Sequence, residues 1–518
     1  MVYKVGIDVG GTNTDAAILD QRNRVLAKTK TPTTPDVSHG IEQALTLVLE
    51  ESGTDRDAVQ YCMLGTTHCV NAILERRSLN RVAVIRIGAP ASKAIPPLFD
   101  WPADLREAVC HDTYLVEGGN EFDGRPIGDL NECRIRTIAS ELDGKVKSVA
   151  VTSIFSPVSG DHENTARDLL AEALGESVFI SVSHEIATIG LLERENATVL
   201  NAALRSVSRT AVRGFRDAVT KLGLRSTLYL GQNDGTLMNV DSALRYPILT
   251  VASGPTNSIR GAAFLAGVKN SIVVDVGGTS TDIGLLKDGF PLESARPVVI
   301  GGVRTNFRMP DMLSLALGGG SRIRYRSGVT VGPDSVGYHL TKDSVVFGGS
   351  TLTATDVAVA LGRCKLGDPG RMTDRSRELL KAVDAKVHGM VEDGIDKVRI
   401  TPDPLPVVLV GGGSILLRNR LKGVSQVIRP EHFDVANAIG VAIAEVGADV
   451  DTILTYETSS RREGIDRTCQ MAIDRAVASG ADPRKTRIAN VEEIPITYLP
   501  GNAVRVRVKA CGALGAAS

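Results

Sequence analysis

The sequence predicts a mixed α/β protein built from two similar lobes. The observation that predicts it is an octapeptide that occurs twice, as Asp8-Val-Gly-Gly-Thr-Asn-Thr-Asp15 and as Asp275-Val-Gly-Gly-Thr-Ser-Thr-Asp282. Each copy follows one short apolar run and precedes another, which is the pattern of a strand, a glycine turn and a second strand. A single short motif has a high false-positive rate, but two near-identical copies at hairpin tips favour two related lobes that close on one ligand.

The composition is that of an ordinary globular protein. The 518 residues are enough for two or three domains, with 43% hydrophobic and 23% charged residues. The 59 basic and 60 acidic side chains give a net charge of −1, so nothing indicates nucleic acid or a membrane surface as a partner. No signal peptide or membrane span is expected. The seven cysteines are scattered and never form C-x-x-C, which fits a reducing cytoplasm better than a disulfide framework.

The first lobe is expected over residues 1–185. After the first hairpin, apolar residues at helical spacing predict a helix over 36–52. Residues 66–76 are predicted as a turn and a helix, and residues 88–145, rich in Gly, Pro and Asp, as an irregular insertion. The other elements expected in this lobe are strands at 61–64, 82–87, 146–155 and 178–182 and a helix at 162–174.

The second lobe is expected over residues 186–450. It begins with a long helical pattern over 186–222, and a buried strand at 407–410 ends in Gly411-Gly-Gly-Ser414. Residues 451–518 are expected as a separate short α/β tail, with an amphipathic helix at 465–478 and a strictly alternating strand at 503–509.

The repeated loop has the chemistry of a phosphate cradle. Glycine supplies positive φ in a sharp turn, and its missing side chain lets phosphate oxygens approach backbone N–H groups. The threonines, Thr281 among them, add hydroxyl donors. The predicted cofactor-binding residues of the two loops are Gly10, Gly11, Thr12, Asn13, Thr14, Gly277, Gly278, Thr279 and Ser280.

The four carboxylates of the loops are unfavourable next to phosphate unless a cation lies between them. We expect Asp8 and Asp275 to hold Mg²⁺ through water, since the ion would reverse the local charge. Asp15 and Asp282 would orient the hydration shell or act as a base. All four are predicted to be catalytic, and ATP with Mg²⁺ is the predicted cofactor pair.

Two further glycine runs are candidates for the same site. Gly318, Gly319 and Gly320 would approach the phosphates through backbone N–H groups, or form a simple turn. Gly411, Gly412 and Gly413 end a buried strand and would accept adenine or ribose, or again form a turn.

A substrate rim is predicted next to a strand end. Thr66, Thr67 and Asn71 are its expected members, and His68 is a candidate general acid or base because imidazole titrates near neutrality. The alternative for His68 is a packing role. Asp356 is assigned to the substrate as well, with helix capping as the alternative.

Taken together, these motifs resemble the hydantoinase A / 5-oxoprolinase family (N-methylhydantoinase A-like), within the actin, sugar-kinase and Hsp70 ATPase superfamily. The matches follow the family's order over about residues 1–450. They are Gly6 to Asp15, Gly65 to Arg77, Ser183-His-Glu-Ile186, Glu193 to Ala202, Ser253-Gly-Pro255, Asp275 to Asp282, Gly318-Gly-Gly-Ser321 and Thr353-Ala-Thr-Asp-Val357.

The resemblance implies two RNase H-like lobes that flank a nucleotide cleft. It also implies ATP-dependent activation of a hydantoin, a lactam or a 5-oxoproline-like cyclic amide by phosphorylation, while related members carboxylate ketones. Three positions depart from the family: Asn13 replaces an aromatic residue, and both Asp311-Met-Leu-Ser and Gly411-Gly-Gly-Ser lack a histidine. Because the hydantoinase B part that performs the hydrolytic half is missing, a partner subunit is expected.

Other functions stay open on the sequence alone. A stand-alone small-molecule kinase, a ketone carboxylase subunit and an ATP-driven protein switch would use the same cleft. The identity of the substrate is open too, as is whether the chain forms a homo-oligomer.

Overall fold

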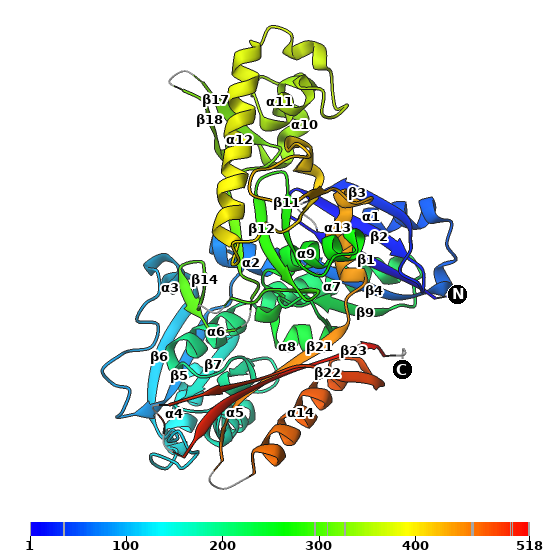
Figure 1. Cartoon of the computed structure of the whole chain (residues 1–518). Coiled ribbons are helices and arrows are strands. Elements are labelled where there is room, and N and C mark those ends of the chain that lie inside the picture. Colours follow the sequence, from blue (N-terminus) through cyan, green and yellow to red (C-terminus); the bar gives the residue numbers. More distant parts are fainter. Residues whose placement is uncertain are drawn as a thin grey trace.

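The computed structural model describes residues 2–34, 37–294, 297–307, 309–325, 328–456, 460–497, 499 and 501–515. The chain forms a mixed α/β structure, which confirms the predicted fold class (Figure 1). Within these residues no helix is long and apolar enough to cross a membrane.

Two sheets of the molecule share one topology. In the first, the strands run in the order β3-β2-β1-β4-β9, and in the second in the order β13-β12-β11-β19-β20. In both orders, the first three strands form an antiparallel meander. The fourth strand pairs in parallel with the third, and the fifth pairs in parallel with the fourth. The strands are β1 (Tyr3–Val9), β2 (Asn13–Leu19), β3 (Val25–Pro32), β4 (Val59–Thr66) and β9 (Thr227–Gly231), then β11 (Ser271–Val276), β12 (Thr281–Lys287), β13 (Phe290–Pro291), β19 (Val407–Val410) and β20 (Val427–Ile428).

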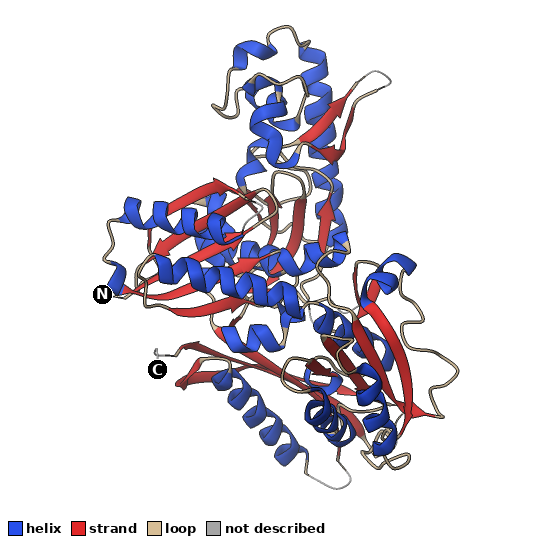
Figure 2. Ribbon diagram, turned by 180° about the vertical axis from the view of Figure 1, so that it is seen from behind, coloured by secondary structure: helices blue, strands red, loops and turns tan. Residues whose placement is uncertain are grey.

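Helices cover both faces of the first sheet. On one face, α1 (Val37–Ser52) and α7 (Arg205–Lys221) pack against β1 and β4, and Figure 2 shows this helical layer from behind. On the other face, α13 (Ala436–Ala442) packs against β2. Strands that are covered on both faces read as nearly continuous apolar runs, which is why Val5, Ile7 and Val9 are all buried.

Two helices connect the sheets. α9 (Ser253–Ala266) packs on the second sheet and α13 on the first, and the two helices cross each other in the middle of the molecule (Figure 1). Their backbones touch, since a Cβ on Gly261 would lie 1.8 Å from the Ala436 carbonyl oxygen and one on Gly440 would lie 1.9 Å from that of Asn257. Only glycine permits a crossing this close.

A third sheet lies beside the first. It is fully parallel, in the order β6-β5-β7-β8, and follows α2 (His68–Glu75) in the chain. Its elements are β5 (Val82–Ala89), α3 (Ala103–Val109), β6 (Cys110–Glu117), α4 (Glu132–Leu142), β7 (Ser148–Ser153), α5 (Asp161–Leu174) and β8 (Phe179–Val182), and α6 (Leu191–Ala203) packs on it.

The remaining elements extend or decorate these sheets. The first sheet continues from β9 through β10 (Leu237–Asn239), β21 (Val446–Thr455), β23 (Ala503–Leu514) and β22 (Ala481–Pro495), covered by α14 (Arg461–Ala478). The others are α8 (Val240–Arg245), β14 (Val298–Ile300), β15 (Val303–Thr305), β16 (Met312–Leu315), β17 (Ser321–Arg324), β18 (Thr330–Ser335), α10 (Leu340–Asp343), α11 (Ala354–Ala360) and α12 (Arg377–Val398).

The sheets do not follow the predicted division of the chain at 186 and 451. Residues 227–239 and 446–514 contribute strands to the sheet that begins at Tyr3, so that sheet draws on all three predicted segments. Residues 88–145 are not an irregular insertion either, because they contain α3, β6 and α4. β6 is a half-exposed edge strand that begins with Cys110-His-Asp-Thr, so it lacks the apolar pattern that betrays a strand in a sequence.

Candidate functional site

The two repeated hairpin tips meet. A Cβ on Gly278 would lie 3.1 Å from Cγ2 and 3.2 Å from Oγ1 of Thr12. The tip of the β1–β2 hairpin and the tip of the β11–β12 hairpin therefore face each other at close range, although they are far apart in the chain. This is the arrangement that two lobes closing on one ligand require.

The two tips have the same backbone geometry. In the first, the Gly10 N–H donates to the Asn13 carbonyl at 3.0 Å, and in the second the Gly277 N–H donates to the Ser280 carbonyl at 2.8 Å. Thr33 braces the first tip by donating its hydroxyl to the Gly10 carbonyl at 2.7 Å. Gly11 stays exposed, with open space where a side chain would stand, so a ligand can reach its backbone.

The Gly318–Gly320 run lies beneath the second tip. Gly319 and Gly320 donate their N–H groups to the carbonyls of Gly277 and Gly278 at 3.0 and 2.7 Å, and the Gly318 N–H donates to Ser321 Oγ at 2.8 Å. All three donors are thus occupied by the protein. The expectation that they bind phosphate directly is wrong for these N–H groups, and the run instead supports the loop that faces the ligand.

The Gly411–Gly413 run lies beside the same tip. A Cβ on Gly411 would stand 2.2 Å from Asp275 Oδ1, and one on Gly413 would stand 2.5 Å from the Gly277 carbonyl oxygen. Gly412 is exposed, and its Cβ position lies 4.0 Å from Cε of Lys30, which comes from β3 of the first sheet. The run therefore lies beside the second tip and close to Lys30 of the first sheet, and a contact with adenine or ribose stays a prediction.

The loop carboxylates are largely shielded from water: Asp8 and Asp15 are buried, and Asp275 and Asp282 are half-buried. Burial raises the pKa of Asp8 to about 7, and the negative charges of Asp15 and Asp275 add to the shift. Asn437 on α13 partly opposes it by donating its side-chain N–H to Asp8 Oδ2 at 2.9 Å. Burial also raises the pKa of Asp282 to about 6, and it raises the pKa of Asp275. Desolvation of this kind disfavours the ionised carboxylate.

Asp15 has a different partner. Burial raises its pKa, but the Lys30 ammonium at 2.5 Å partly offsets the shift. Lys30 also acts on the pKa of Asp275, so one cation serves carboxylates from both lobes. Two buried and two half-buried acids with one nearby ammonium leave the site electronegative, which favours a divalent cation.

The residues present fit a hydrated Mg²⁺. Asp8 Oδ1 is buried without a hydrogen bond of normal geometry, so it has capacity for an ordered water or an ion. Within the described ranges, no group of three or more His, Cys, Asp or Glu side chains lies close enough to hold a metal directly. Mg²⁺ commonly keeps several waters and uses one or two carboxylates together with substrate phosphates. Asp8 and Asp275 can supply that kind of support.

The predicted substrate rim lies next to the first tip. Thr67, between β4 and α2, donates its N–H to the Val9 carbonyl at 3.3 Å, and Asn71 Nδ2 lies 3.4 Å from Thr67 Oγ1. His68 Nδ1 lies 2.5 Å from Thr66 Oγ1. Burial lowers the pKa of His68, so its ring is neutral at pH 7. Neutral imidazole is the form that a general base needs.

Asp356 is a capping residue, and its predicted substrate role is not supported. It stands three residues after the N-cap Thr353 of α11, and the two residues form a reciprocal capping box. Its carboxylate also accepts hydrogen bonds from Ser344 Oγ at 2.9 Å and the Val346 N–H at 2.7 Å. The side chain is fully buried, and both of its oxygens are engaged.

Sequence reasoning missed several residues of the site. Lys30, Asn437 and Asn257 belong to no motif that could be recognised, because their contacts with Asp8 or Asp15 come from elements far apart in the chain. Ser253-Gly-Pro255 is part of the family resemblance, but no sequence pattern indicates that it begins α9 close to Asp8.

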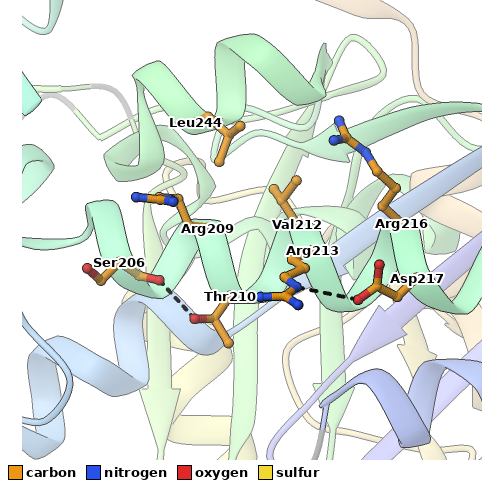
Figure 3. A pocket seen from close by; sticks show the side chains of 8 residues that line it. All are labelled: Ser206, Arg209, Thr210, Val212, Arg213, Arg216, Asp217 and Leu244. Carbon is orange, nitrogen blue, oxygen red and sulfur yellow. Dashed lines mark hydrogen bonds and ion pairs between the residues drawn. The ribbon is translucent and has the colours of Figure 1, made fainter. Parts of the chain in front are cut away.

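The surface also carries a hollow of about 510 Å³ between α7 and α8, far from the repeated loops in the chain. Figure 3 shows Arg209, Arg213 and Arg216 along α7, with Leu244 above the helix and an ion pair between Arg213 and Asp217. None of the predicted site residues lines it. We therefore take the place where the two hairpin tips meet as the candidate site.

Comparison with known proteins gives two family matches. The hydantoinase/oxoprolinase N-terminal region matches residues 4–174, and the hydantoinase/oxoprolinase region matches residues 194–376. The caprolactamase α subunit of Pseudomonas jessenii is 28% identical over 70% of this chain and 54% of its own length. The acetophenone carboxylase γ subunit of Aromatoleum aromaticum is 27% identical over 70% of this chain and 53% of its own length. The chain thus spans about half the length of these relatives.

The crystal structure of the ATP-dependent caprolactamase from Pseudomonas jessenii superimposes with a TM-score of 0.76 at 20% identity. The match covers 98% of this chain and 87% of that one. At this identity the likeness shows a shared fold.

Proposed function

The chain belongs to the hydantoinase/oxoprolinase family, and on that premise we propose that it uses ATP to phosphorylate a cyclic amide of the hydantoin, lactam or 5-oxoproline kind. The observation that carries the proposal is the meeting of the two repeated tips, with Gly278 against Thr12 and four carboxylates, two buried and two half-buried, behind them. A pair of glycine-rich tips with free backbone on the first and a cation site behind it suits a triphosphate.

The proposed chemistry overcomes the resistance of amides to hydrolysis. The amide oxygen forms a bond to the terminal phosphorus of ATP, the bond to the bridging oxygen breaks, and ADP leaves with that electron pair. The amide carbon becomes a good electrophile, and water can then add to it. The ring C–N bond breaks, and the phosphoryl group leaves as inorganic phosphate. Mg²⁺ bound at the site would neutralise the charge on the transferring phosphates.

The residues of the gap take separate roles in this proposal. Gly10, Gly11 and Thr12 from one lobe and Gly277, Gly278 and Thr279 from the other would cradle the phosphates. Asp8 and Asp275 would hold the hydrated cation, with Asp15 and Asp282 as supporting acids. Thr66, Thr67, Asn71 and neutral His68 would form the rim at which the amide binds.

We infer that a second subunit of the hydantoinase B type completes the ring opening. The names of both curated relatives describe subunits, which supports an assembly. We also propose a reducing cytoplasm as the location, because all seven cysteines are free thiols in the structure.

Ketone carboxylation is the second candidate, because the acetophenone carboxylase subunit is as similar to this chain as the caprolactamase subunit is. An enol or enolate oxygen would then take the phosphoryl group in place of the amide oxygen. Both reactions place the same demand on the site, which is to present an oxygen nucleophile to the terminal phosphate of ATP.

ADP release measured against a panel of lactams, hydantoins, 5-oxoproline and small ketones tests the proposal. Each compound is assayed with the chain alone and with a hydantoinase B-type subunit, and Asp8→Ala is the control that should abolish ADP release. We expect a cyclic amide to stimulate ADP release and to be opened only with the second subunit. A stable phosphate ester of an alcohol or acid, made by the chain alone, would favour a kinase. Slow turnover that responds only to a protein client would favour an ATP-driven switch.

A further inference from the structure

Two helices begin at the same place, beside Asp8. α2 begins at His68 directly after Thr67, and α9 begins at Ser253. A Cβ on Gly254 would lie 3.5 Å from Cγ2 of Thr67 and 3.8 Å from both carboxylate oxygens of Asp8. The first turns of the two helices therefore face each other where the first hairpin tip begins.

Some of the donors at the start of these helices are uncapped. The N-cap residue of neither helix accepts a hydrogen bond with its side chain, and in α2 the His68 N–H donates instead to Thr66 Oγ1 at 3.2 Å. The first N–H groups of a helix have no acceptor within it, and in α9 these are the N–H groups of Ser253 and Gly254, because Pro255 has none. Within the part of the chain that the structure describes, no acceptor meets these two donors. Helix N-termini attract anions through such donors and the helix dipole.

A buried side chain points to a ligand at the same place. Asn257, one turn into α9, is fully buried, and neither of its amide atoms makes a hydrogen bond of normal geometry. Its Nδ2 and Asp8 Oδ1 lie 2.5 and 2.3 Å from the point where a Cβ on Gly65 would stand. Asn257 lies close enough to Asp8 to oppose the rise of its pKa, yet Asn257 Nδ2, Asn257 Oδ1 and Asp8 Oδ1 make no hydrogen bond of normal geometry. Because buried polar groups are almost always paired, this points to a further partner.

We propose that the N-terminal turns of α2 and α9, together with Asn257, bind the phosphoryl group that passes from ATP to the substrate. This inference rests on the proposed function and deepens it by assigning the transferred group to residues outside the repeated loops. The ligand class is a phosphate dianion, held first as the terminal phosphate of ATP and then as the O-phosphate of the amide. As the new bond to phosphorus forms, the amide nitrogen becomes positively charged and gives its proton to water.

A methyl group on Gly254 tests the inference. The nearest atoms would lie 3.5 and 3.8 Å from an added Cβ, so Gly254→Ala fits without moving its neighbours while it fills the space over the N–H groups. Gly389→Ala in α12 is the matched control, because nothing lies within 4 Å of its Cβ position. Asn257→Ala is the second variant, and it removes no well-formed hydrogen bond.

Calorimetry on the full chain measures two affinities, that of Mg²⁺·ADP and that of inorganic phosphate for the Mg²⁺·ADP complex. Gly254→Ala and Gly389→Ala should bind Mg²⁺·ADP within about twofold of the unchanged protein, since the loops are untouched. Asn257 contacts Asp8, so the phosphate affinity of Asn257→Ala is measured at saturating Mg²⁺·ADP. Gly254→Ala and Asn257→Ala should reduce the affinity for inorganic phosphate by roughly tenfold or more, because each variant loses a hydrogen bond to a charged group. Gly389→Ala should bind phosphate normally.

Two results would overturn the inference while leaving the nucleotide site intact. One is normal phosphate affinity in both Gly254→Ala and Asn257→Ala. The other is an unchanged protein that binds Mg²⁺·ADP but never binds phosphate. A failure of the unchanged protein to bind Mg²⁺·ADP at all would contradict the proposed function itself, so the two failures are distinguishable.

Discussion

At the scale of single residues, the site depends on carboxylates that the fold keeps away from water. Asp8 lies beneath the α9 N-terminus and receives one hydrogen bond from Asn437, which leaves its other oxygen unpaired. Burying an ionised carboxylate costs free energy unless a cation or donors compensate it. The free protein therefore carries a local instability that a bound cation would relieve, as expected of a functional site.

The raised pKa of Asp8 predicts a pH dependence of stability without Mg²⁺. Below about pH 4, both the folded and the unfolded chain hold this proton. Between pH 4 and the folded-state pKa of about 7, only the folded chain keeps it, so the free energy of unfolding falls as pH rises across this window. The three-unit shift corresponds to roughly 4 kcal/mol.

Urea unfolding in the presence of a chelator measures the free energy of unfolding at pH 5 and at pH 8. Asp8→Asn should reduce the difference between these two values, because the amide does not titrate. The same variant should be more stable than the unchanged protein at pH 8 and should lose stabilisation by Mg²⁺·ATP. Equal pH dependence in the two proteins would contradict the assignment of the shift to Asp8.

Asp356 is a buried acid whose removal should lower the stability of the fold and leave nucleotide binding unchanged, in contrast to Asp8. Its oxygens hold Thr353, Ser344 and Val346, so Asp356→Ala should leave several buried donors unpaired and cost about 3 kcal/mol of stability. The affinity of the folded variant for Mg²⁺·ATP should be unchanged. Denaturant unfolding and calorimetry measure the two quantities, and a large loss of affinity at normal stability would restore the substrate role.

At the scale of elements, the sequence predicted those helices and strands whose own residues carry a local pattern. The two hairpins follow from short apolar runs around a glycine turn, and α1 follows from its helical spacing of Ile41, Ala44, Leu45 and Val48. β6 could not be predicted, since a half-exposed edge strand with polar residues lacks a clear period. The approach of the two hairpin tips was expected from the repetition alone, whereas Asn257 and Asn437 reach the site only through the crossing of α9 and α13.

The crossing of α9 and α13 predicts a strong effect of a single methyl group. In Gly261→Ala, the new Cβ would stand 1.8 Å from the Ala436 carbonyl oxygen, so the helices must separate. We expect a loss of about 3 kcal/mol, typical of overpacking, and weaker nucleotide binding because Asn257 and Asn437 would shift apart. Gly389→Ala should be neutral or slightly stabilising, since alanine favours a helix. Denaturant unfolding compares the two, and similar stabilities would refute the close crossing.

At the scale of the whole molecule, the first sheet joins the two ends of the chain. β21 pairs with β10 and β23, so residues 446–514 form one edge of the sheet that begins at Tyr3. The strict alternation over 503–509 indicated a strand, but its partner could not be read from the sequence because pairing between distant segments leaves no local signal. Its Lys509 is buried and lies 2.7 Å from Asp234, which follows β9.

This buried ion pair predicts how the C-terminal strands are attached. Burial raises the pKa of Asp234, but the Lys509 ammonium more than offsets it and leaves the pKa at about 2. The pair therefore stabilises the fold above about pH 4, and that contribution is lost as pH falls towards 2. Lys509→Met would leave the Asp234 carboxylate buried without its cation, with hydrogen bonds from Thr236 alone, which should cost about 3 to 5 kcal/mol at pH 7. The pH dependence of the free energy of unfolding should then reverse. The lone buried acid prefers its proton, so the variant gains stability as pH falls from 7 to 4.

Combining Lys509→Met with Asp234→Asn should recover much of the lost stability. Urea unfolding at pH 4 and pH 7 measures all three proteins, and a single variant as stable as the unchanged protein at pH 7 would show that apolar packing of Val506 and Val508 alone holds the strands.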